Sequence, residues 1–146
     1  MKTVRLSHIY DHPPQTVWGG ATDLECLQEA MRGLITFKGL PSGAIHQGQI
    51  LEVEVSMFGV LPYQPYRMEL LEVDAEAHYV TSNEQGMGVE HWQHSLRILP
   101  HERGAELIDE IEIEAGWRTS VVCAWARFMY KRRHKPRLAM LARQSS

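Results

Sequence analysis

The middle of the chain alternates between apolar and polar positions with the period of two that is typical of β-strands. In the segment 49–57, Leu51 and Val53 fall on one face, whereas Glu52 and Glu54 fall on the other. Similar segments, separated by turn residues, predict strands over residues 3–10, 49–57, 63–73, 78–84, 89–99 and 105–113. Because short connections join the later strands, a meandering antiparallel sheet is expected.

Two short helices are predicted between the first strand and the others. Pro14 can occupy the first turn of a helix that ends at the glycines 19–20. Thr22 and Glu25 have the spacing of a capping box, in which each side chain caps the backbone of the other residue. They predict a second helix that continues through about Met31.

After Gly116 the apolar period changes to that of an α-helix. Apolar and aromatic side chains recur along one stripe at Trp117, Val121, Trp125 and Phe128. Pro136 is expected to kink this helix or to end its first part, with a second helical part that includes Leu141. Only this long helix offers enough apolar face to fill the hollow of a curved sheet, so the pattern predicts an α+β fold.

The last two strands are the most informative part of the pattern. A two-residue turn at 101–102 would pair Pro100 with Arg103. On the inward, mostly apolar face, this register pairs Ile98 with Ala105, Leu96 with Leu107, His94 with Asp109, Trp92 with Ile111 and Glu90 with Ile113. On the other face it places opposite charges such as Arg97 and Glu106 across from each other, which contributes roughly 0.2–1 kcal/mol for each pair. A shift of two residues would keep the faces but lose this charge pairing.

His94 and Asp109 are the candidate catalytic residues. Ionisable groups on an apolar face are costly unless they are paired, and directly opposed residues are close enough to hydrogen-bond. An aspartate beside a histidine favours the imidazolium and fixes its tautomer, which prepares a general acid or base. The alternative is a buried polar pair that only satisfies itself, and the sequence does not distinguish the two.

Short motifs in a characteristic order occur along nearly the whole chain. They are Ile9 with Pro13–Pro14, Val17–Trp18, Asp23, Phe58–Gly59, Leu61–Pro62, Trp92–Gln93–His94, Asp109–Glu110–Ile111, Gly116 and Tyr130–Lys131–Arg132–Arg133–His134. With the element order, they resemble the START/Bet v 1-like superfamily, and within it the bacterial proteins of the polyketide cyclase/dehydrase type. The resemblance implies a helix-grip fold, in which a curved antiparallel sheet in the order β-α-α-β6-α wraps around a long C-terminal helix.

The resemblance also implies a cavity between the sheet and the last helix, in which superfamily members hold lipids, polyketides or aromatic compounds. The superfamily has no shared catalytic residues, so none can be assigned by resemblance. The side chains expected to line the cavity are Tyr66, Met68, Glu90, Trp92, Leu96, Ile111, Trp117, Val121, Trp125 and Phe128. Aromatic and methionine side chains suit flat apolar ligands, but each of them also suits plain core packing.

Composition and charge narrow the function classes. The apolar fraction is 44%, and no apolar stretch approaches the roughly 20 residues that span a bilayer, so membrane insertion is not expected. The net charge of −3 gives no electrostatic reason to expect nucleic acid. Cys26 and Cys123 have no metal-like spacing and are expected to be free thiols, which favours a cytoplasmic protein.

Metal and cofactor motifs are missing from the sequence. His91 and His94 are three residues apart, which on a strand places them on opposite faces, so they cannot share an ion. No phosphate-binding glycine motif and no nucleophile elbow occurs, and neither a metal nor a cofactor is expected. The basic run 127–137 is interpreted as a solvated helix face rather than a surface for an anion, a membrane or nucleic acid.

Three functions remain open for a chain interpreted as one domain over residues 1–146. The first is binding of a small hydrophobic or aromatic molecule that is lipid- or polyketide-like. The second is a polyketide cyclase, aromatase or dehydratase in which His94 and Asp109 move protons at an enolisable carbon. The third is an interaction module. The sequence leaves three points open, namely the ligand, the choice between monomer and homodimer, and the inward face of residues 79–83.

Overall fold

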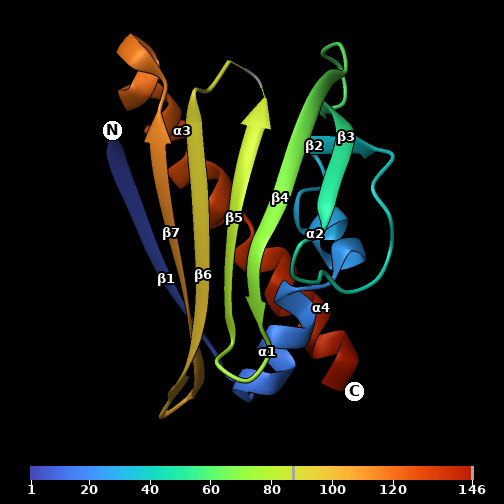
Figure 1. Cartoon of the computed structure of the whole chain (residues 1–146). Coiled ribbons are helices and arrows are strands. Elements are labelled where there is room, and N and C mark those ends of the chain that lie inside the picture. The colour runs from blue at the N-terminus through green and yellow to red at the C-terminus, as the bar shows by residue number, and fades with distance from the viewer. Residues whose placement is uncertain (87, 146) are drawn as a thin grey trace.

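A seven-stranded antiparallel sheet dominates the computed structural model, which describes residues 1–86 and 88–145. The strands are β1 (Lys2–Tyr10), β2 (Ile35–Lys38), β3 (Ile50–Met57), β4 (Gln64–Asp74), β5 (Tyr79–Gly86), β6 (His91–His101) and β7 (Gly104–Glu114). Their order is β1-β7-β6-β5-β4-β3-β2, so only β1 lies beside a strand distant in sequence. Figure 1 shows the strands side by side with the C-terminal helices behind them.

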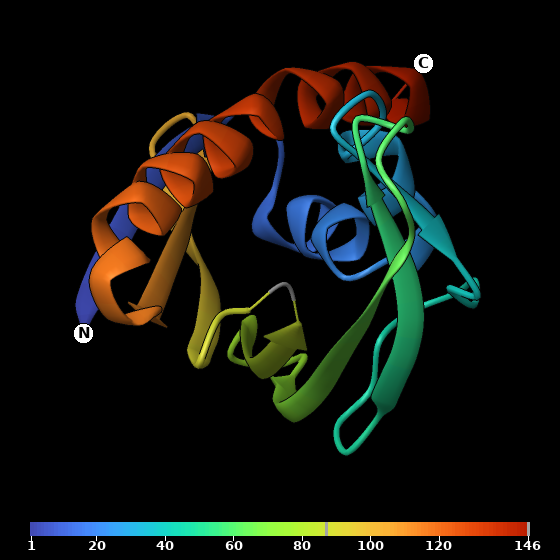
Figure 2. The ribbon, with the colours of Figure 1, turned by 90° about the horizontal axis from the view of Figure 1, so that it is seen from above.

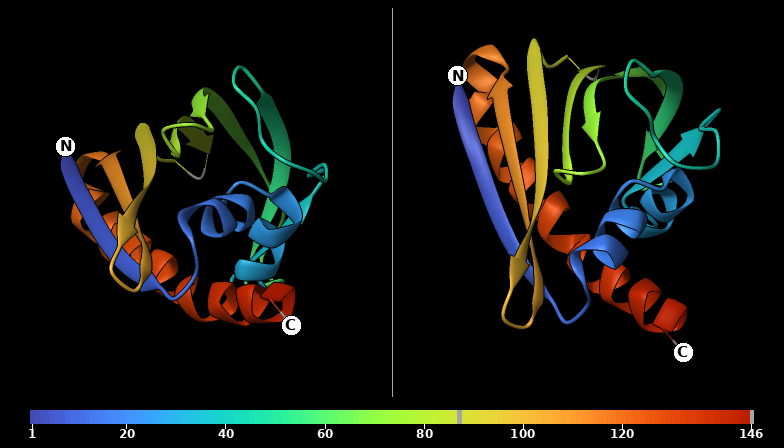
Figure 3. Two further views of the ribbon diagram at one scale, coloured as in Figure 1. Left: turned by 90° about the horizontal axis from the view of Figure 1, so that it is seen from below. Right: turned by 60° about the horizontal axis from the view of Figure 1, so that its bottom comes forward.

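Helices lie against the concave side of this sheet. In the described part of the chain they are α1 (Pro14–Ala21), α2 (Leu24–Ala30), α3 (Thr119–Arg132) and α4 (His134–Ser145), with a 3₁₀ turn at Gly116–Arg118 before α3. Seen from above, the sheet curves around and α3 and α4 run across its open side (Figure 2). The helices α1 and α2 lie inside the curve, beside α4 (Figure 3). No helix among the described residues is long and apolar enough to cross a bilayer.

The helix-grip fold and its element order β-α-α-β6-α are confirmed. Alternation predicts five of the six strands that follow α2, with ends that differ by at most two residues. It does not predict β2, because that strand is only four residues long and pairs with β3 alone, from Ile35 opposite Met57 to Lys38 opposite Glu54. A strand this short carries too few positions for a period of two to be recognised.

Pro14 and Asp23 define the N-terminal ends of the two short helices. Pro14 lies at the start of α1, as expected. The predicted capping box is wrong by one residue, because Asp23 rather than Thr22 is the N-cap of α2. Its Oδ1 accepts hydrogen bonds from the backbone N–H groups of Glu25 and Cys26 at 2.9 and 3.1 Å. The Thr22 hydroxyl instead donates to a carbonyl of α1 at 2.7 Å.

The long C-terminal helix is interrupted at Arg133, close to the expected position. Pro136 lies in the first turn of α4 and has no N–H to donate to the carbonyl of Arg132, so the hydrogen-bond ladder of α3 cannot continue through it. The two parts have different supports, because α3 packs on β1 and β7 whereas α4 packs on α1 and α2.

The hairpin of β6 and β7 has the expected inward and outward faces but not the predicted register. His101 pairs with Gly104, so every pair is displaced by two residues, and His94 lies opposite Ile111 rather than Asp109. Gly104 has a φ of 142°, and a Cβ there would lie only 2.5 Å from a backbone oxygen of the β1–α1 connection. This close approach requires glycine directly after the turn and favours the observed register.

The predicted charge pairing on the exposed face forms only in part, since His91 lies 4.0 Å from Glu112 across a diagonal of the ladder. Arg97 does not lie opposite Glu106; its guanidinium lies over the Tyr79 ring, 5.0 Å from the centroid. Arg103 donates two hydrogen bonds to Asp11 at 3.0 Å and so ties the hairpin turn to the end of β1. Pairs on a solvated face are worth too little to outweigh backbone geometry at the turn.

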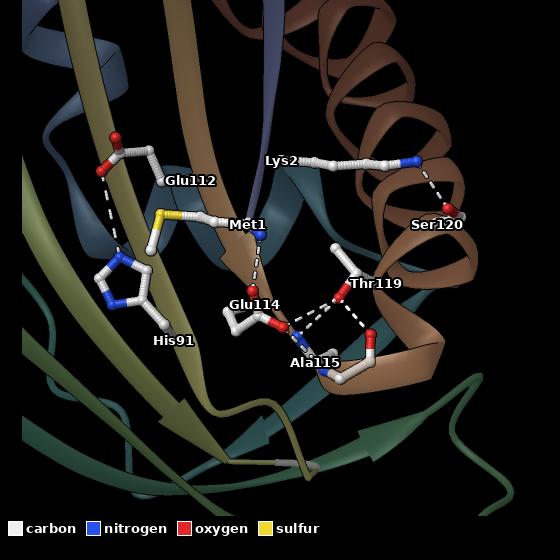
Figure 4. A network of polar contacts seen from close by, with 9 residues as sticks. Met1, Lys2, His91, Glu112, Glu114, Ala115, Thr119 and Ser120 are labelled. Carbon is white, nitrogen blue, oxygen red and sulfur yellow. Dashed lines mark hydrogen bonds and ion pairs between the residues drawn. The ribbon is translucent and has the colours of Figure 1, made fainter.

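Polar contacts fasten the beginning of α3 to the edge of the sheet (Figure 4). The Thr119 hydroxyl accepts the N–H of Ala115 at 3.0 Å and donates to the carbonyl of Gly116 at 2.7 Å. Lys2 of β1 donates to the Ser120 hydroxyl at 2.7 Å. These contacts hold the beginning of α3 beside β1 at the edge of the sheet.

Two clusters of buried apolar side chains fill much of the concave side. One includes Tyr10, Trp18, Leu51, Leu96 and Leu107, beside α1 and α4. The other includes Val4, Met31, Trp92, Ile111 and Met129, beneath α3. Unfilled space remains between them.

Candidate functional site

Two adjoining chambers lie between the sheet and the helices. The larger has a volume of about 220 Å³ and is called the apolar chamber; the smaller, of about 90 Å³, is called the mixed chamber. Both are lined by Leu27, Met68, Glu84, Tyr130 and Arg133, so these residues form a shared wall. An apolar cavity of roughly 150 Å³ is enough to bind benzene, so the apolar chamber has room for at least one ring.

The lining of the apolar chamber is mainly aliphatic, aromatic and sulfur-containing. Its residues come mainly from α2, α3 and the strands β2 to β6, and include Met31, Phe37, Val55, Trp92, Val122 and Trp125. Such a lining favours an apolar ligand, because flat rings pack well against indole and thioether groups.

The mixed chamber combines apolar walls with ionisable groups. Leu24, Leu51 and Leu96 contribute apolar surface, whereas His94 and Arg137 contribute polar atoms. Arg137 is only 9% exposed although it belongs to the basic run. The interpretation of residues 127–137 as a purely solvated face is therefore wrong for this residue.

Glu84 is the central polar group of the shared wall, and the sequence interpretation did not single it out. Val80 and Ser82 are buried and line the mixed chamber, which settles the undetermined face of β5, and Glu84 follows at the next inward position. Its carboxylate accepts hydrogen bonds from the hydroxyls of Tyr66 and Ser82, the latter at 3.2 Å, and lies 3.9 Å from Nδ1 of His94. Continuing the alternation by two residues would have found it.

His94 and Asp109 meet in the interior, across a diagonal of the β6–β7 ladder. Nε2 of His94 lies 2.7 Å from Oδ1 of Asp109, so the predicted contact is confirmed although the predicted register is wrong. Burial raises the pKa of the Asp109 carboxyl, but the hydrogen bond and charge of His94, with the charges of Arg137 and Arg133, hold it below its usual value. Asp109 is therefore a carboxylate at neutral pH.

This arrangement leaves one nitrogen of His94 free for other chemistry. Because the Asp109 carboxylate only accepts hydrogen bonds, Nε2 carries the proton that the two groups share. Nδ1 then faces the carboxylate of Glu84 and the mixed chamber. A ligand in the chamber can exchange a proton with Nδ1, while Asp109 holds the ring in place.

The C-terminal helices supply the opposite side of the site. The Tyr130 ring is almost fully buried and lies 5.0 Å from the His94 ring, and burial raises the pKa of its hydroxyl. The Arg133 guanidinium lies 4.0 Å over the Tyr130 ring, and its Nε donates to Sδ of Met31 at 3.0 Å. Arg133 follows Tyr130 by three residues, a spacing that places both on one helix face.

The predicted lining residues fall into three groups. Tyr66, Met68, Trp92, Leu96 and Trp125 line one or both chambers. Ile111 is fully buried in the apolar cluster beneath α3 and does not line either chamber, so it is a packing residue. The third group does not lie in the interior.

Four predicted lining residues are exposed instead. Glu90 lies before the first residue of β6 and is exposed, because the strand begins later than predicted. Trp117, Val121 and Phe128 are 89%, 69% and 46% exposed. The predicted positions of these four residues are wrong.

The error in the helix has one cause, a rotation of α3 relative to the predicted orientation. The helix turns Val122, Ala126 and Met129 toward the sheet, whereas Val121 and Phe128 of the predicted stripe point outward. Both faces of α3 carry apolar side chains, so the period alone does not decide between them.

A cysteine thiol also lines the mixed chamber. Both cysteines are free thiols, as expected, and Cys26 lines the mixed chamber. Burial raises the pKa of the Cys26 thiol, so it stays protonated at neutral pH. Within residues 1–86 and 88–145, no group of three or more His, Cys, Asp and Glu side chains is arranged to hold a metal ion.

Comparison with known proteins yields one family and several solved structures with the same fold. The family model described as "Domain of unknown function (DUF8410)" matches residues 8–142. No curated protein matches the sequence. Among solved structures, protein CV1439 from Chromobacterium violaceum is 17% identical with a TM-score of 0.77, over 95% of this chain and 96% of that one.

Two further solved structures are of enzymes. The Zhui aromatase/cyclase from Streptomyces sp. R1128 is 12% identical with a TM-score of 0.72, over 99% of this chain and 96% of that one. A norcoclaurine synthase point mutant from Thalictrum flavum, in complex with a transition-state analogue, is 13% identical with a TM-score of 0.74, over the same shares. At these identities the likeness shows a common fold.

Proposed function

We propose that this chain, which belongs to the family of the domain of unknown function DUF8410, binds a small, largely apolar and aromatic molecule. The chain has the START/Bet v 1-like fold, and its site is the basis of the proposal. The observation that carries the proposal is the apolar chamber, which leaves about 220 Å³ unfilled beside Trp92 and Trp125. A void of this size forfeits packing contacts, and an apolar ligand restores them while removing its own surface from water. The two enzymes with this fold support a small-molecule site.

The ligand we propose has an apolar ring system and at least one polar group. Its rings occupy the apolar chamber, and its polar group reaches the shared wall. There Arg133 can donate to a ligand oxygen, and the carboxylate of Glu84 can accept from a ligand hydroxyl or amine. A few placed polar groups in an apolar pocket are what fix the orientation of a bound small molecule.

A matched pair of variants on α3 tests the proposal with 1-naphthol as the probe. Val122 lines the apolar chamber, whereas its neighbour Val121 is 69% exposed. Val122→Phe fills the chamber and should weaken the binding of 1-naphthol, measured by titration calorimetry, at least about tenfold. Val121→Phe makes the same chemical change outside the chamber and should leave the affinity unaltered. Equal affinities for the two variants, or no binding by the unaltered chain, would sink the proposal.

A second candidate function is proton-transfer catalysis on a polyketide-like substrate, as in a cyclase, aromatase or dehydratase. The observation that favours it is the bond of 2.7 Å between His94 and the buried Asp109, which orients Nδ1 toward the chamber. His94 would remove a proton from an enolisable carbon, and the bound chain would be held in a folded shape by the walls. Asp109 would stabilise the imidazolium that forms.

A further inference from the structure

The apolar side chains that α3 turns outward have no role in either chamber. Trp117, Val121 and Phe128 follow one side of the helix and are 89%, 69% and 46% exposed. Trp125 lies between them and contacts the Phe128 ring at 5.7 Å between centroids. In Figure 2, α3 and α4 run along one side of the molecule, so one face of each points away from the sheet. Large contiguous apolar patches of this kind mark interaction sites.

The loop between β3 and β4 extends this patch. Phe58, Val60 and Leu61 are 49%, 81% and 49% exposed, and Phe58 has a φ of 58°, a left-handed conformation that is unfavourable for its side chain. The Phe58 ring contacts the Trp125 ring at 5.7 Å, so the loop and the helix form one surface. This surface, called the outer aromatic face, consists of Phe58, Val60, Leu61, Trp117, Val121, Trp125 and Phe128.

Charge is distributed unevenly along the chain that forms this face. All 18 acidic residues lie at or before Glu114, whereas eight of the 15 lysines and arginines follow it. Four of these basic residues are exposed on α3 and α4, namely Arg127, Lys131, Arg132 and Lys135. The helices therefore present exposed aromatic side chains flanked by positive charge without a single acidic residue.

We propose that the outer aromatic face and its basic flank bind the surface of an anionic lipid membrane. Helices with Lys and Arg on one side and Trp, Phe and aliphatic residues on the other lie in the membrane interface, with their apolar side among the acyl chains. Anionic headgroups attract the basic flank over the distance of a Debye length. A second copy of the chain is a poorer occupant, because two such faces would bring like charges together.

The outer aromatic face also adjoins the apolar chamber. Trp125 lines that chamber and contacts both Phe58 and Phe128 on the outer face. A lipid surface bound here would lie against the wall of the chamber. Membrane binding is nevertheless tested separately from the proposed ligand, because Trp117, Phe58, Lys131 and Arg132 do not line either chamber.

Sedimentation with lipid vesicles tests this inference directly. The chain should bind vesicles of phosphatidylcholine mixed with phosphatidylserine, bind pure phosphatidylcholine at least about tenfold more weakly, and lose affinity as salt is added. On binding, emission from Trp117 should shift to the blue and be quenched by brominated lipid, because an 89% exposed indole enters the bilayer interface. A Lys131→Glu, Arg132→Glu double variant should lose the preference for phosphatidylserine.

The apolar contribution needs a matched control. A Trp117→Ser, Phe58→Ser double variant should reduce vesicle binding at least about tenfold. Leu71→Ser with Leu99→Ser removes side chains of 40% and 38% exposure from β4 and β6 and should leave binding unaltered. Equal losses in both double variants would overturn the inference. Concentration-dependent dimerisation that shifts Trp117 emission without vesicles would also overturn it and assign the face to a second copy.

Discussion

The two chambers share a wall but differ in the chemistry of their surfaces. The apolar chamber is enclosed by side chains such as Phe37, Val55 and Trp92, whereas the mixed chamber collects His94 and Arg137. The apolar chamber can supply affinity through the surface that it buries, with little demand on the exact shape of the ligand. The mixed chamber can supply orientation or reaction, since unpaired polar groups there reject a ligand that does not match them.

The largest expected effect is on turnover, after a substitution of His94 that separates the contributions of the two chambers. His94→Gln removes the ring nitrogen that faces the mixed chamber but alters nothing in the apolar chamber. Binding of 1-naphthol should stay within about threefold of its original value. Turnover of a polyketide-like substrate, if proton transfer occurs at this ring, should fall roughly 10²–10⁴-fold.

A control on the same strand accompanies this change. His91→Gln replaces a histidine that faces outward toward Glu112, so it should alter neither measurement. Loss of 1-naphthol affinity in His94→Gln alone would mean that the chambers act as one site and would end the comparison. Unaltered turnover in the same variant would remove His94 from the mechanism.

A smaller effect is expected on stability at Asp109, which is fully buried beneath the mixed chamber. Asp109→Ala leaves His94 without its partner and should lower the free energy of unfolding by about 1.5–3 kcal/mol, measured in urea at neutral pH. The folded chain holds the Asp109 pKa below its ordinary value of 3.8, so this stabilisation is present above that pH. It should disappear as the pH falls through the lower, folded-state pKa.

Asp109→Asn provides the matched control for shape. It keeps the volume and one oxygen acceptor, so its cost at neutral pH should be smaller than that of the alanine variant. Equal costs for both variants would indicate that the carboxylate charge, rather than the space it fills, accounts for the effect. A gain of stability in either variant would contradict the assignment of the pair.

The smallest effect concerns two histidines that lie near Arg137 on the side of the mixed chamber. The rings of His8 and His134 stack at 4.5 Å, and burial lowers the pKa of each below 6.5. The neutral forms are therefore favoured in the folded chain, and their contribution is present above pH 6.5 and lost as the pH falls below it. Unfolding between pH 7 and pH 5 should show a loss of less than about 1 kcal/mol.

The double variant His8→Gln, His134→Gln should remove this dependence on pH. His8 and His134 line neither chamber, so the measurement reports on the packing around Tyr10 and Arg137 rather than on either ligand site. A pH dependence that persists in the double variant would place its origin elsewhere.

Sequence reasoning predicts correctly which side chains of a strand face the interior, because burial decides that face. The inward face of β6 was predictable because an apolar period of two has only two possible orientations, and the charged positions exclude one of them. His94 and Asp109 were found for that reason. Their contact survived an error of two residues in register, because a shift of two keeps every side chain on its face.

Sequence reasoning failed where competing interactions are of similar strength. Val121 and Val122 are adjacent and equally apolar, so the helix period did not reveal which of them faces the sheet. Arg133 and Glu84 were missed because a charged residue is expected at the surface, and only the fold places these two in the interior. The hydrogen bonds of Thr119 at the beginning of α3 are local contacts that no apolar period reports.

The interruption at Arg133 gives the cover over the chambers two separately fastened parts. α3 is held by β1 and β7, whereas α4 rests on α1 and α2. Only one residue joins them, so a small change in its backbone angles can tilt one helix without detaching either from its support. A joint of this kind is a place where hinge motion can occur. Because the Arg133 side chain itself lines both chambers, a molecule that contacts it would act at this joint.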